Sequence, residues 1–331
     1  MRGIIDVSVI IVNWNTRDIL RDCLRSVYAE TAGIDFEVVV VDNASADGSA
    51  AMVRAEFPRA ILIENRENRG FAAGNNQAMR VATGRYVLLL NSDTVVLDGA
   101  VQKTVAFADA HPDTAVVGCY VLHDDGSRQR SCFLFPSLLN VGLMVTYLWK
   151  MFPRSRFCGR QMMSWWQGDD SREVEVVSGC FMCVRMEAIR QVGLFDESFY
   201  FYGEEADWCR RFRTAGWRLL YTPGARIIHL AGASARVLGW RSDAMLTRAL
   251  VRLFRKHYAG WYARTAEALL WLFNGSRVIW WWLVAWCSGR EKAAGRYRHF
   301  WEIWRHWGIP DAVLWPRRGF RPMMHSKAAA R

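Results

Sequence analysis

Arg85-Tyr86-Val87-Leu88-Leu89-Leu90-Asn91-Ser92-Asp93 predicts a buried strand with a polar end, and the other elements are placed around it. Its continuous apolar run is typical of a strand covered on both faces of a sheet. Ligands bind beyond the carboxyl ends of the strands in an open parallel sheet, and a carboxylate there can hold a divalent cation. The polar end therefore predicts a binding site. The alternative is that Asp93 only caps the helix that follows.

Strands and helices alternate in the sequence before Asp93. Further apolar runs predict strands at residues 7–12, 36–41 and 60–63, and helical patterns follow each of them, the last at residues 71–82. Such alternation predicts an α/β fold with a doubly wound parallel sheet. Right-handed crossovers bring the carboxyl ends of these strands to one edge of the sheet.

The pattern is looser after Asp93. Residues 123–172 are irregular, and residues 174–184 predict either a strand pair or one long strand. The remaining predicted elements are helices at 101–110, 187–192 and 204–215, and strands at 115–122, 219–221 and 226–229.

The basic charge of the chain is concentrated in its last third. From Gly239 onward there are 17 Lys and Arg against 5 Asp and Glu, whereas the first 238 residues carry 26 against 27. The same last segment holds 11 of the 17 tryptophans. Basic residues interleaved with Trp suit the headgroup region of an anionic membrane. Nucleic acid is the alternative partner, but the aliphatic runs beside these residues favour the membrane, and we predict no nucleic-acid partner.

Two helical patterns follow Gly239. Residues 242–258 are amphipathic, and residues 268–286 are strongly apolar but interrupted by Asn274, Ser276 and Arg277. An arginine at the bilayer centre costs about 2.5–3.5 kcal/mol. We therefore expect helices lying in the membrane interface rather than a span. The alternative is a helical hairpin packed on the preceding domain.

The eight cysteines show no pairing pattern, which predicts reduced thiols in a cytoplasmic protein. Cys180 and Cys183 have a Cys-x-x-Cys spacing, but they lie in an apolar run that favours a buried strand over a redox or zinc site. The first apolar run is too short for a signal peptide.

Six motifs, in order, resemble the family 2 glycosyltransferases and, within them, the rhamnosyltransferase-like branch. They are VIIVNWN at 9–15, VVDNAS at 40–45, NRGFAAGNN at 68–76, LLNSD at 89–93, YGEEADWCRR at 202–211 and HLAGAS at 229–234. The resemblance implies a GT-A fold, in which a Rossmann-like, mostly parallel sheet is flanked by helices. Residues 1–98 would form the nucleotide-sugar-binding half and 99–238 the acceptor and catalytic half. A helical, basic, Trp-rich extension would follow at 239–331.

For the donor, the resemblance places Asp42 against the base, with Asn13 and Asn43 framing the nucleoside. An Asx turn is the alternative role for Asp42. The loop at 68–76 enters a helix N-terminus, where exposed N–H groups favour anions. The donor-binding residues implied in addition are Asn68, Gly70, Gly74, Asn75 and Asn91.

For the metal, Asn91-Ser92-Asp93 resembles a degenerate form of the family motif, because Asn91 replaces the usual first acid. Asp93 is then the metal carboxylate, and the His-x-x-Gly-x-Ser setting makes His229 the second ligand. Bound Mg²⁺ or Mn²⁺ would neutralise the charge on the leaving diphosphate.

For the base, the resemblance points to Glu204-Glu205-x-Asp207, where most members have Glu-Asp-x-Asp with the second acid as general base. That position is Glu205 here, and the choice between Glu205 and Asp207 stays open. The alternative is helix electrostatics, with acids in a first turn and Asp207 paired with Arg211.

Taken together, the sequence predicts an inverting transfer from a dTDP- or UDP-sugar, with rhamnose favoured, to a hydroxyl of a glycan or lipid-linked glycan in cell-surface polysaccharide assembly. The enzyme would be peripheral or monotopic at the inner face of the cell membrane. The alternatives are a soluble transferase acting on protein or small metabolites, and an inactive nucleotide-sugar- or glycan-binding assembly partner. The acids at 93, 204, 205 and 207 favour activity.

Overall fold

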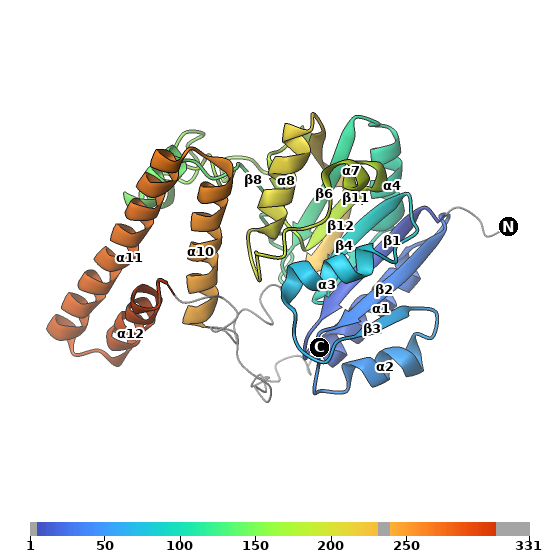
Figure 1. The fold of residues 1–331 in the computed structure, drawn as a ribbon, viewed down its shortest axis with the longest axis horizontal. Coiled ribbons are helices and arrows are strands. Elements are labelled where there is room, and N and C mark those ends of the chain that lie inside the picture. Colours follow the sequence, from blue (N-terminus) through green and yellow to red (C-terminus); the bar gives the residue numbers. More distant parts are fainter. Residues whose placement is uncertain (1–4, 231–238, 309–331) are drawn as a thin grey trace.

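A mixed, ten-stranded sheet organises the first 230 residues, and a group of helices lies beside it (Figure 1). The structure is a computed structural model that describes residues 5–230 and 239–308. Four parallel strands form one half of the sheet in the order β3-β2-β1-β4. They are β1 (Val7–Asn13), β2 (Phe36–Asp42), β3 (Ile61–Glu64) and β4 (Tyr86–Asn91). The predicted parallel sheet is confirmed for this half.

The second half of the sheet mixes strand directions. Strand β11 (Phe181–Arg185) lies antiparallel between β4 and β6 (Thr114–Leu122), and β12 (Arg218–His229) runs parallel to β6. Strand β5 (Thr94–Leu97), which the sequence did not predict, closes this edge antiparallel to β12. The smaller strands are β7 (Arg128–Gln129), β8 (Cys132–Phe133), β9 (Arg172–Glu173) and β10 (Val176–Val177).

One sequence prediction is decided in this half and another changes. The stretch at 174–184, predicted as a strand pair or one long strand, is two strands in different sheets, because β10 pairs with β8 while β11 enters the large sheet. The two strands predicted at 219–221 and 226–229 are one strand, β12, with an irregularity between Thr222 and Arg226.

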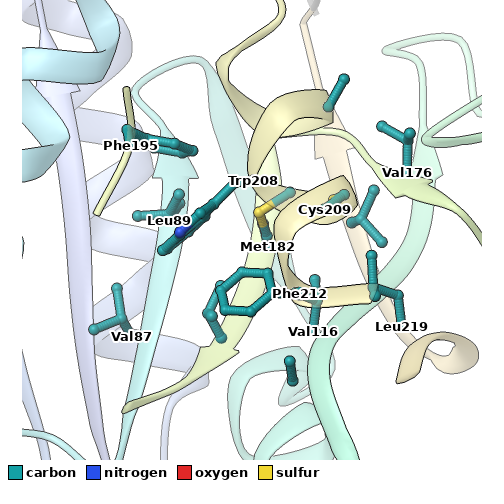
Figure 2. Packing of buried hydrophobic residues seen from close by; sticks show 14 of the residues in the cluster. Val87, Leu89, Val116, Val176, Met182, Phe195, Trp208, Cys209, Phe212 and Leu219 are labelled. Carbon is teal, nitrogen blue, oxygen red and sulfur yellow. The ribbon is translucent and has the colours of Figure 1, made fainter. Parts of the chain in front are cut away.

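Helices cover both faces of the sheet because its central strands are apolar on both sides. One face packs against α1 (Arg17–Glu30), α2 (Ser49–Glu56) and α4 (Ala100–Asp109). The other packs against α3 (Gly70–Met79), α7 (Met186–Val192) and α8 (Glu204–Thr214). Trp208 and Phe212 of α8 lie over Leu89 of β4 and Met182 of β11 (Figure 2). Helix α8 is thereby fixed on the sheet.

The chain after residue 239 forms α10 (Trp240–His257), α11 (Gly260–Ser288) and α12 (Glu291–Arg305), of which α11 and α12 are antiparallel neighbours (Figure 1). The two short helices α5 (Leu138–Val145) and α6 (Leu148–Met151) come from the irregular segment. Helix α5 packs on α10 and α11 through Val141, Phe254 and Leu270. Ala249 and Leu253 of α10 belong to the main core, so the extension predicted to begin at residue 239 is joined to the sheet domain.

Helix α11 is the one helix among the described residues that is long and apolar enough to cross a membrane, judged by length and composition alone. Only 22% of its most apolar window is buried. The guanidinium of Arg277 lies 3.8 Å from the ring centroid of Phe300 in α12, so this charge packs inside the hairpin. The large apolar side chains of α11 that are exposed are Trp261, Trp271, Leu272, Ile279, Trp280, Trp282, Leu283 and Trp286.

Cys180 and Cys183 are both buried, Cys183 within β11 as predicted and Cys180 in the turn directly before that strand. Burial raises the pKa of each of these two thiols to about 12. They are therefore protonated at neutral pH and behave as small apolar residues.

Candidate active site

A cleft of about 340 Å³ lies where β1 and β4 end and α8 begins. This is the sheet edge that the sequence predicted. Its walls gather segments that are far apart in the chain. Among the residues that line it are Asn13, Trp14, Thr16, Asn43, Asn68, Gly70, Asn91, Asp93, Gln129, Gly179, Tyr202, Glu204, Glu205 and His229.

Asp93 and His229 meet in this cleft because of the strand pairing. Strand β12 pairs with β5 so that His229 lies opposite Thr94, the residue that follows Asp93. The His229 Nε2 atom is 3.1 Å from Asp93 Oδ1 and 3.3 Å from Asn91 Nδ2. The other ring nitrogen, Nδ1, is 3.2 Å from Gln129 Oε1. A side-chain amide that contacts the second ring nitrogen holds the imidazole in place, as around metal-bound histidines.

These donors fit a divalent cation that shares its ligands with a bound substrate. A carboxylate oxygen and an imidazole nitrogen both suit Mn²⁺, whereas Mg²⁺ usually keeps several waters and takes phosphate oxygens. In residues 5–230 and 239–308, no three His, Cys, Asp or Glu side chains gather to hold a metal by themselves. Asp93 and His229 would therefore leave most coordination positions to water and phosphate oxygens.

Glu204 and Glu205 begin α8 at the cleft wall. Each has one buried side-chain oxygen, Oε2, that has no hydrogen-bond partner in the described part of the chain. Burial, and then the neighbouring Glu205 charge, raise the pKa of Glu204 well above its usual value. Burial also raises the pKa of Glu205, against the backbone N–H groups of Gly203 and Gly179. A carboxylate with a raised pKa and a vacant acceptor oxygen is suited to take a proton at neutral pH.

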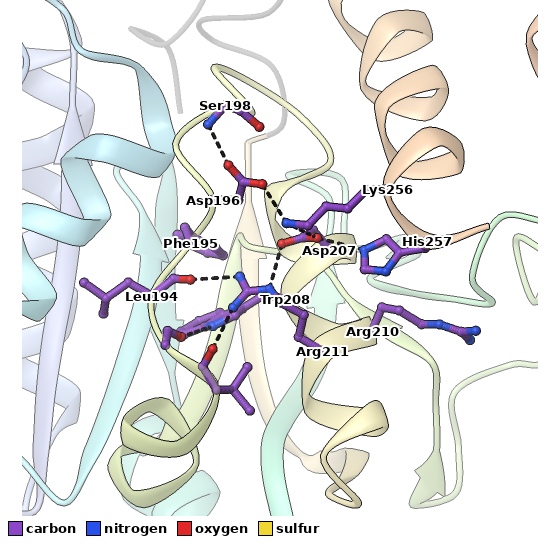
Figure 3. Close-up of polar contacts among 12 residues, drawn as sticks. Leu194, Phe195, Asp196, Ser198, Asp207, Trp208, Arg210, Arg211, Lys256 and His257 are labelled. Atoms are coloured by element: carbon purple, nitrogen blue, oxygen red, sulfur yellow. Dashed lines mark hydrogen bonds and ion pairs between the residues drawn. The ribbon is translucent and has the colours of Figure 1, made fainter. Parts of the chain in front are cut away.

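Asp207 lies on the other side of α8 and does not line the cleft. Its Oδ1 accepts from His257 Nε2 and Lys256 Nζ, each at 2.8 Å, and its Oδ2 accepts from Arg211 Nε at 2.9 Å (Figure 3). Burial would raise the pKa of Asp207, but bonds from His257, Lys256 and Arg211 outweigh burial and hold it below the usual value. The sequence left the base open between Glu205 and Asp207, and this position favours Glu205. The predicted pairing of Asp207 with Arg211 is present.

Asn13 and Asn43 line the cleft, whereas Asp42 supports them from behind. The Asn13 Nδ2 donates to Asp42 Oδ1 at 3.1 Å, and the Ser45 N–H donates to Asp42 Oδ2 at 3.0 Å. The second bond joins Asp42 to a backbone N–H three residues later, so it is a local side-chain-to-backbone bond but not the i to i+2 bond of the Asx turn that was the alternative role. Asp42 is buried and does not line the cleft, so its contact with the cleft is through Asn13.

The loop before α3 divides into a cleft part and a packing part. Asn68 and Gly70 line the cleft, and Gly70 has a φ of +83°, with Tyr200 O only 2.6 Å from where a Cβ would lie. The Gly70 N–H donates to Asn68 Oδ1 and the Phe71 N–H to Tyr200 O. The first N–H groups of α3 therefore already have protein partners, which weakens the predicted anion site.

Gly74 and Asn75, which the sequence assigned to donor binding, lie inside α3 and do not line the cleft. A Cβ at Gly74 would lie 3.0 Å from Val12 Cγ1, so this glycine permits close packing of α3 on β1. Asn75 Nδ2 donates to Phe71 O within the same helix. Both residues act in packing, and we do not retain them as ligands.

Several cleft residues were not predicted as site residues from the sequence, among them Gln129, Trp14 and Tyr202. Gln129 lies in a short strand within the stretch that the sequence showed as irregular. Trp14 and Tyr202 lie within two of the quoted motifs, and the aromatic pair Phe201-Tyr202 directly before the acids was the available signal.

Comparison with known proteins gives a consistent set of matches. The family model for glycosyl transferase family 2 matches residues 8–158, and that for glycosyl transferase family group 2 matches residues 86–290. The N-acetylglucosaminyl-diphospho-decaprenol L-rhamnosyltransferase of Mycobacterium tuberculosis is 27% identical over 254 residues, which are 73% of this chain and 81% of that protein. The O-antigen biosynthesis protein RfbC of Myxococcus xanthus is 26% identical over 71% of this chain and 18% of its own length.

Among solved structures, the mannosyltransferase PcManGT from Pyrobaculum calidifontis, in complex with GDP-Man and Mn²⁺, has a TM-score of 0.53 at 19% identity. The match covers 95% of this chain and 86% of that chain. At this identity the likeness concerns the fold alone.

Proposed function

Because the chain belongs to the family 2 glycosyltransferases and has the GT-A fold, we propose that it transfers a sugar from a nucleoside-diphosphate sugar to a hydroxyl group with inversion. One observation carries the proposal. Glu205, whose buried Oε2 has no hydrogen-bond partner among residues 5–230 and 239–308, lines the same cleft as the Asp93–His229 pair. A base and a metal-binding pair in one cleft are what a displacement of this kind requires.

The proposed reaction assigns one step to each group. The acceptor oxygen attacks the anomeric carbon as the bond from that carbon to the diphosphate oxygen breaks, and Glu205 takes the hydroxyl proton. The donor is held at the ends of β1 and β4 by the cleft residues Asn13, Asn43, Asn68, Gly70 and Asn91. Asp42 lies behind them and accepts a hydrogen bond from Asn13. A cation held by Asp93 and His229, Mg²⁺ or Mn²⁺, supplies charge neutralisation on the leaving diphosphate.

We further propose a dTDP- or UDP-sugar donor, with rhamnose favoured, and a glycan or lipid-linked glycan acceptor in cell-surface polysaccharide assembly. The support is the named activity of the mycobacterial relative and the named process of RfbC. A panel of nucleotide sugars, each scored for Mn²⁺-dependent thermal stabilisation, tests this, since a ligand that binds only the folded state raises its melting temperature. If none of the dTDP- and UDP-sugars raises the melting temperature, the proposed donor class is rejected.

Replacing the proposed base gives the decisive test of activity. We expect Glu205→Gln to lower transfer by about 10²–10⁴-fold, the range for loss of a general base, while Mn²⁺-dependent donor binding is kept. Glu187→Gln, an acid in the first turn of α7, is the matched control and should transfer normally. Full transfer by Glu205→Gln rejects the assignment, and a wild-type chain that binds donor without transfer supports the inactive assembly partner.

The exposed face of α11 supports a place at the inner surface of the cell membrane. Leu272, Ile279, Leu283 and Trp286 follow helical spacing on this face, and Arg277 is turned inward to α12. Apolar and Trp side chains next to a basic segment bind anionic bilayers. We expect co-flotation with anionic lipid vesicles, reduced by the change Trp280→Ser with Trp286→Ser. Unchanged flotation of that variant would contradict this location.

A further inference from the structure

Helix α10 presents one stripe of residues to the cleft wall that carries Glu205. Ser242, Ala249 and Lys256 are spaced seven residues apart, so they share a face of the helix. They contact Tyr202, Gly203 and Asp207, the segment in which Glu204 and Glu205 lie. We call these six residues, together with His257, the α8–α10 contact.

The first two contacts fix the start of α8. Tyr202 Oη and Ser242 Oγ are 2.8 Å apart and share a hydrogen bond. Gly203 has a φ of +88°, and a Cβ at this position would lie 3.0 Å from Ala249 Cβ. The Ala249 side chain of α10 therefore packs directly on the residue that precedes Glu204.

The third contact is the ion cluster around Asp207, whose side chain is 0% exposed. Two of its three partners, Lys256 and His257, come from the last turn of α10. Lys256 Nζ also reaches Asp196 Oδ2 at 2.6 Å, and the Ser198 N–H donates to the other oxygen of Asp196 (Figure 3). A buried carboxylate that has three donors is held in one position, because losing any of them leaves a charge unpaired.

The donor side of the cleft is built on other elements. Asn13, Asn91 and Asp93 follow β1 and β4, and His229 ends β12. A small displacement of α8 would move Glu205 relative to a bound sugar while these residues stay in place. Such a displacement costs turnover, and a shift of 1 Å can cost about 10²-fold.

We propose that α10 sets the position of Glu205, and that Asp207 is the positioning residue through which it does so. The inference rests on the proposed role of Glu205 as base. The helical extension would thereby contribute to catalysis by positioning Glu205, whether or not it also contacts a membrane.

The test compares turnover with donor binding in Asp207→Asn and His257→Asn. We expect each variant to lower kcat by about 10–100-fold, the effect of a displaced catalytic group, with the donor KM changed less than about threefold. The kcat of the double variant should be about as low as that of the more damaging single variant, because each single change already disrupts the Asp207–His257 bond. Arg255→Met is the matched control, since it breaks an ion pair of α10 with Glu267 of α11 and should keep wild-type kcat. A kcat of Asp207→Asn within about threefold of wild type overturns the inference.

Backbone hydrogen exchange at residues 203–207 gives a readout that needs no activity. Ser242→Ala removes one hydrogen bond and Lys256→Met removes the ion pairs of Lys256 with Asp207 and Asp196, while Asp207 keeps its other partners, so both variants serve even if Asp207→Asn does not fold. We expect faster exchange at these amides in both variants and unchanged exchange in Arg255→Met; unchanged exchange in all three overturns the inference. If the wild-type chain shows no transfer, the proposed function fails, and exchange alone then decides whether α10 holds this wall.

Discussion

Glu205 and Asp207 lie two residues apart on one helix, yet the structure gives them opposite surroundings. Glu205 lines the cleft with a buried oxygen that has no partner in the described residues, and burial raises its pKa. Asp207 lies on the far side with three donors, which hold its pKa below the usual value despite burial. Burial without partners makes a carboxylate reactive, whereas burial with partners makes it structural.

The difference follows from the geometry of α8. Residues i and i+2 of a helix point in different directions, so Glu205 and Asp207 cannot face the same surroundings. Trp208 and Phe212 pack on the sheet and fix which side of the helix faces the cleft. One acidic motif can therefore supply both a base and an anchor.

Removing the anchor should have the largest effect on stability. Asp207→Ala leaves Lys256, His257 and Arg211 without their shared carboxylate, and breaking such a buried pair costs about 3–5 kcal/mol. Urea unfolding measures this change. Asp196→Ala is the matched control, because it removes the more exposed partner of Lys256 and should cost about 1 kcal/mol or less. An equal loss of unfolding free energy in the two variants would contradict the special structural role of Asp207.

Removing the metal carboxylate should act on ligand binding rather than on folding. With donor and Mn²⁺ at about 100 times their Kd, wild type gains about 2.7 kcal/mol, or about 4 °C in Tm for a chain of this length. Asp93→Ala should lose this shift, whereas Asp207→Asn should keep it. A full shift in Asp93→Ala would show that the cleft acid does not hold the ion.

The two sides should also differ in the pH dependence of stability. The pKa of Glu204 is raised by burial, so its contribution is present below the unfolded pKa of about 4.3 and is lost as pH rises through the folded value. The lowered pKa of Asp207 acts in reverse, because its contribution is present above about pH 3.9 and is lost as pH falls.

We therefore expect Glu204→Gln to flatten the decline in stability at higher pH, and Asp207→Asn to flatten the decline at acid pH. Urea unfolding across the pH range checks both by their slopes. A steeper alkaline decline in Glu204→Gln than in wild type would contradict the assigned direction.

The two ends of α8 provide the smallest and most controlled comparison. Gly203 and Gly216 have φ values of +88° and +90°, so alanine at either position costs about 1–2 kcal/mol of backbone strain. The two glycines differ in their neighbours, since Ala249 Cβ is 3.0 Å from the would-be Cβ of Gly203 and no atom of the described residues lies within 4 Å of that of Gly216. Gly203→Ala should therefore cost about 1 kcal/mol more than Gly216→Ala, from overpacking. Equal unfolding free energies of Gly203→Ala and Gly216→Ala would indicate that α10 shifts to accommodate the added methyl group.

The sequence predicted what depends on local pattern. Apolar runs located β1, β2, β3 and β4, and the polar ends of β1 and β4 located one side of the cleft, because parallel strands end at one edge. The pairing of His229 with Asp93 came only through the family resemblance, since it depends on the register between β12 and β5. Strand β5 was missed because its four residues follow the polar motif without a break.

Long-range packing set the limits of that prediction. Nothing in the acidic motif shows that Asp207 meets Lys256 and His257 about fifty residues later. Gly74 was predicted to bind the donor because a glycine at a loop-helix junction has the same local sequence pattern whether it approaches a phosphate or a strand. Arg277 interrupts an apolar run in the sequence, but its ring contact with Phe300 depends on how two helices pack.

The central claim is that a sugar nucleotide and its cation occupy one cleft between Asp93 and Glu205. A crystal structure of the chain grown with Mn²⁺ and a dTDP or UDP ligand, with Mn²⁺ located by anomalous scattering, measures this directly. We predict a single strong Mn²⁺ peak bound by Asp93, His229 and the diphosphate, with Glu205 facing the vacant sugar position. A peak away from Asp93 and His229, or a nucleotide outside the cleft, would contradict the account.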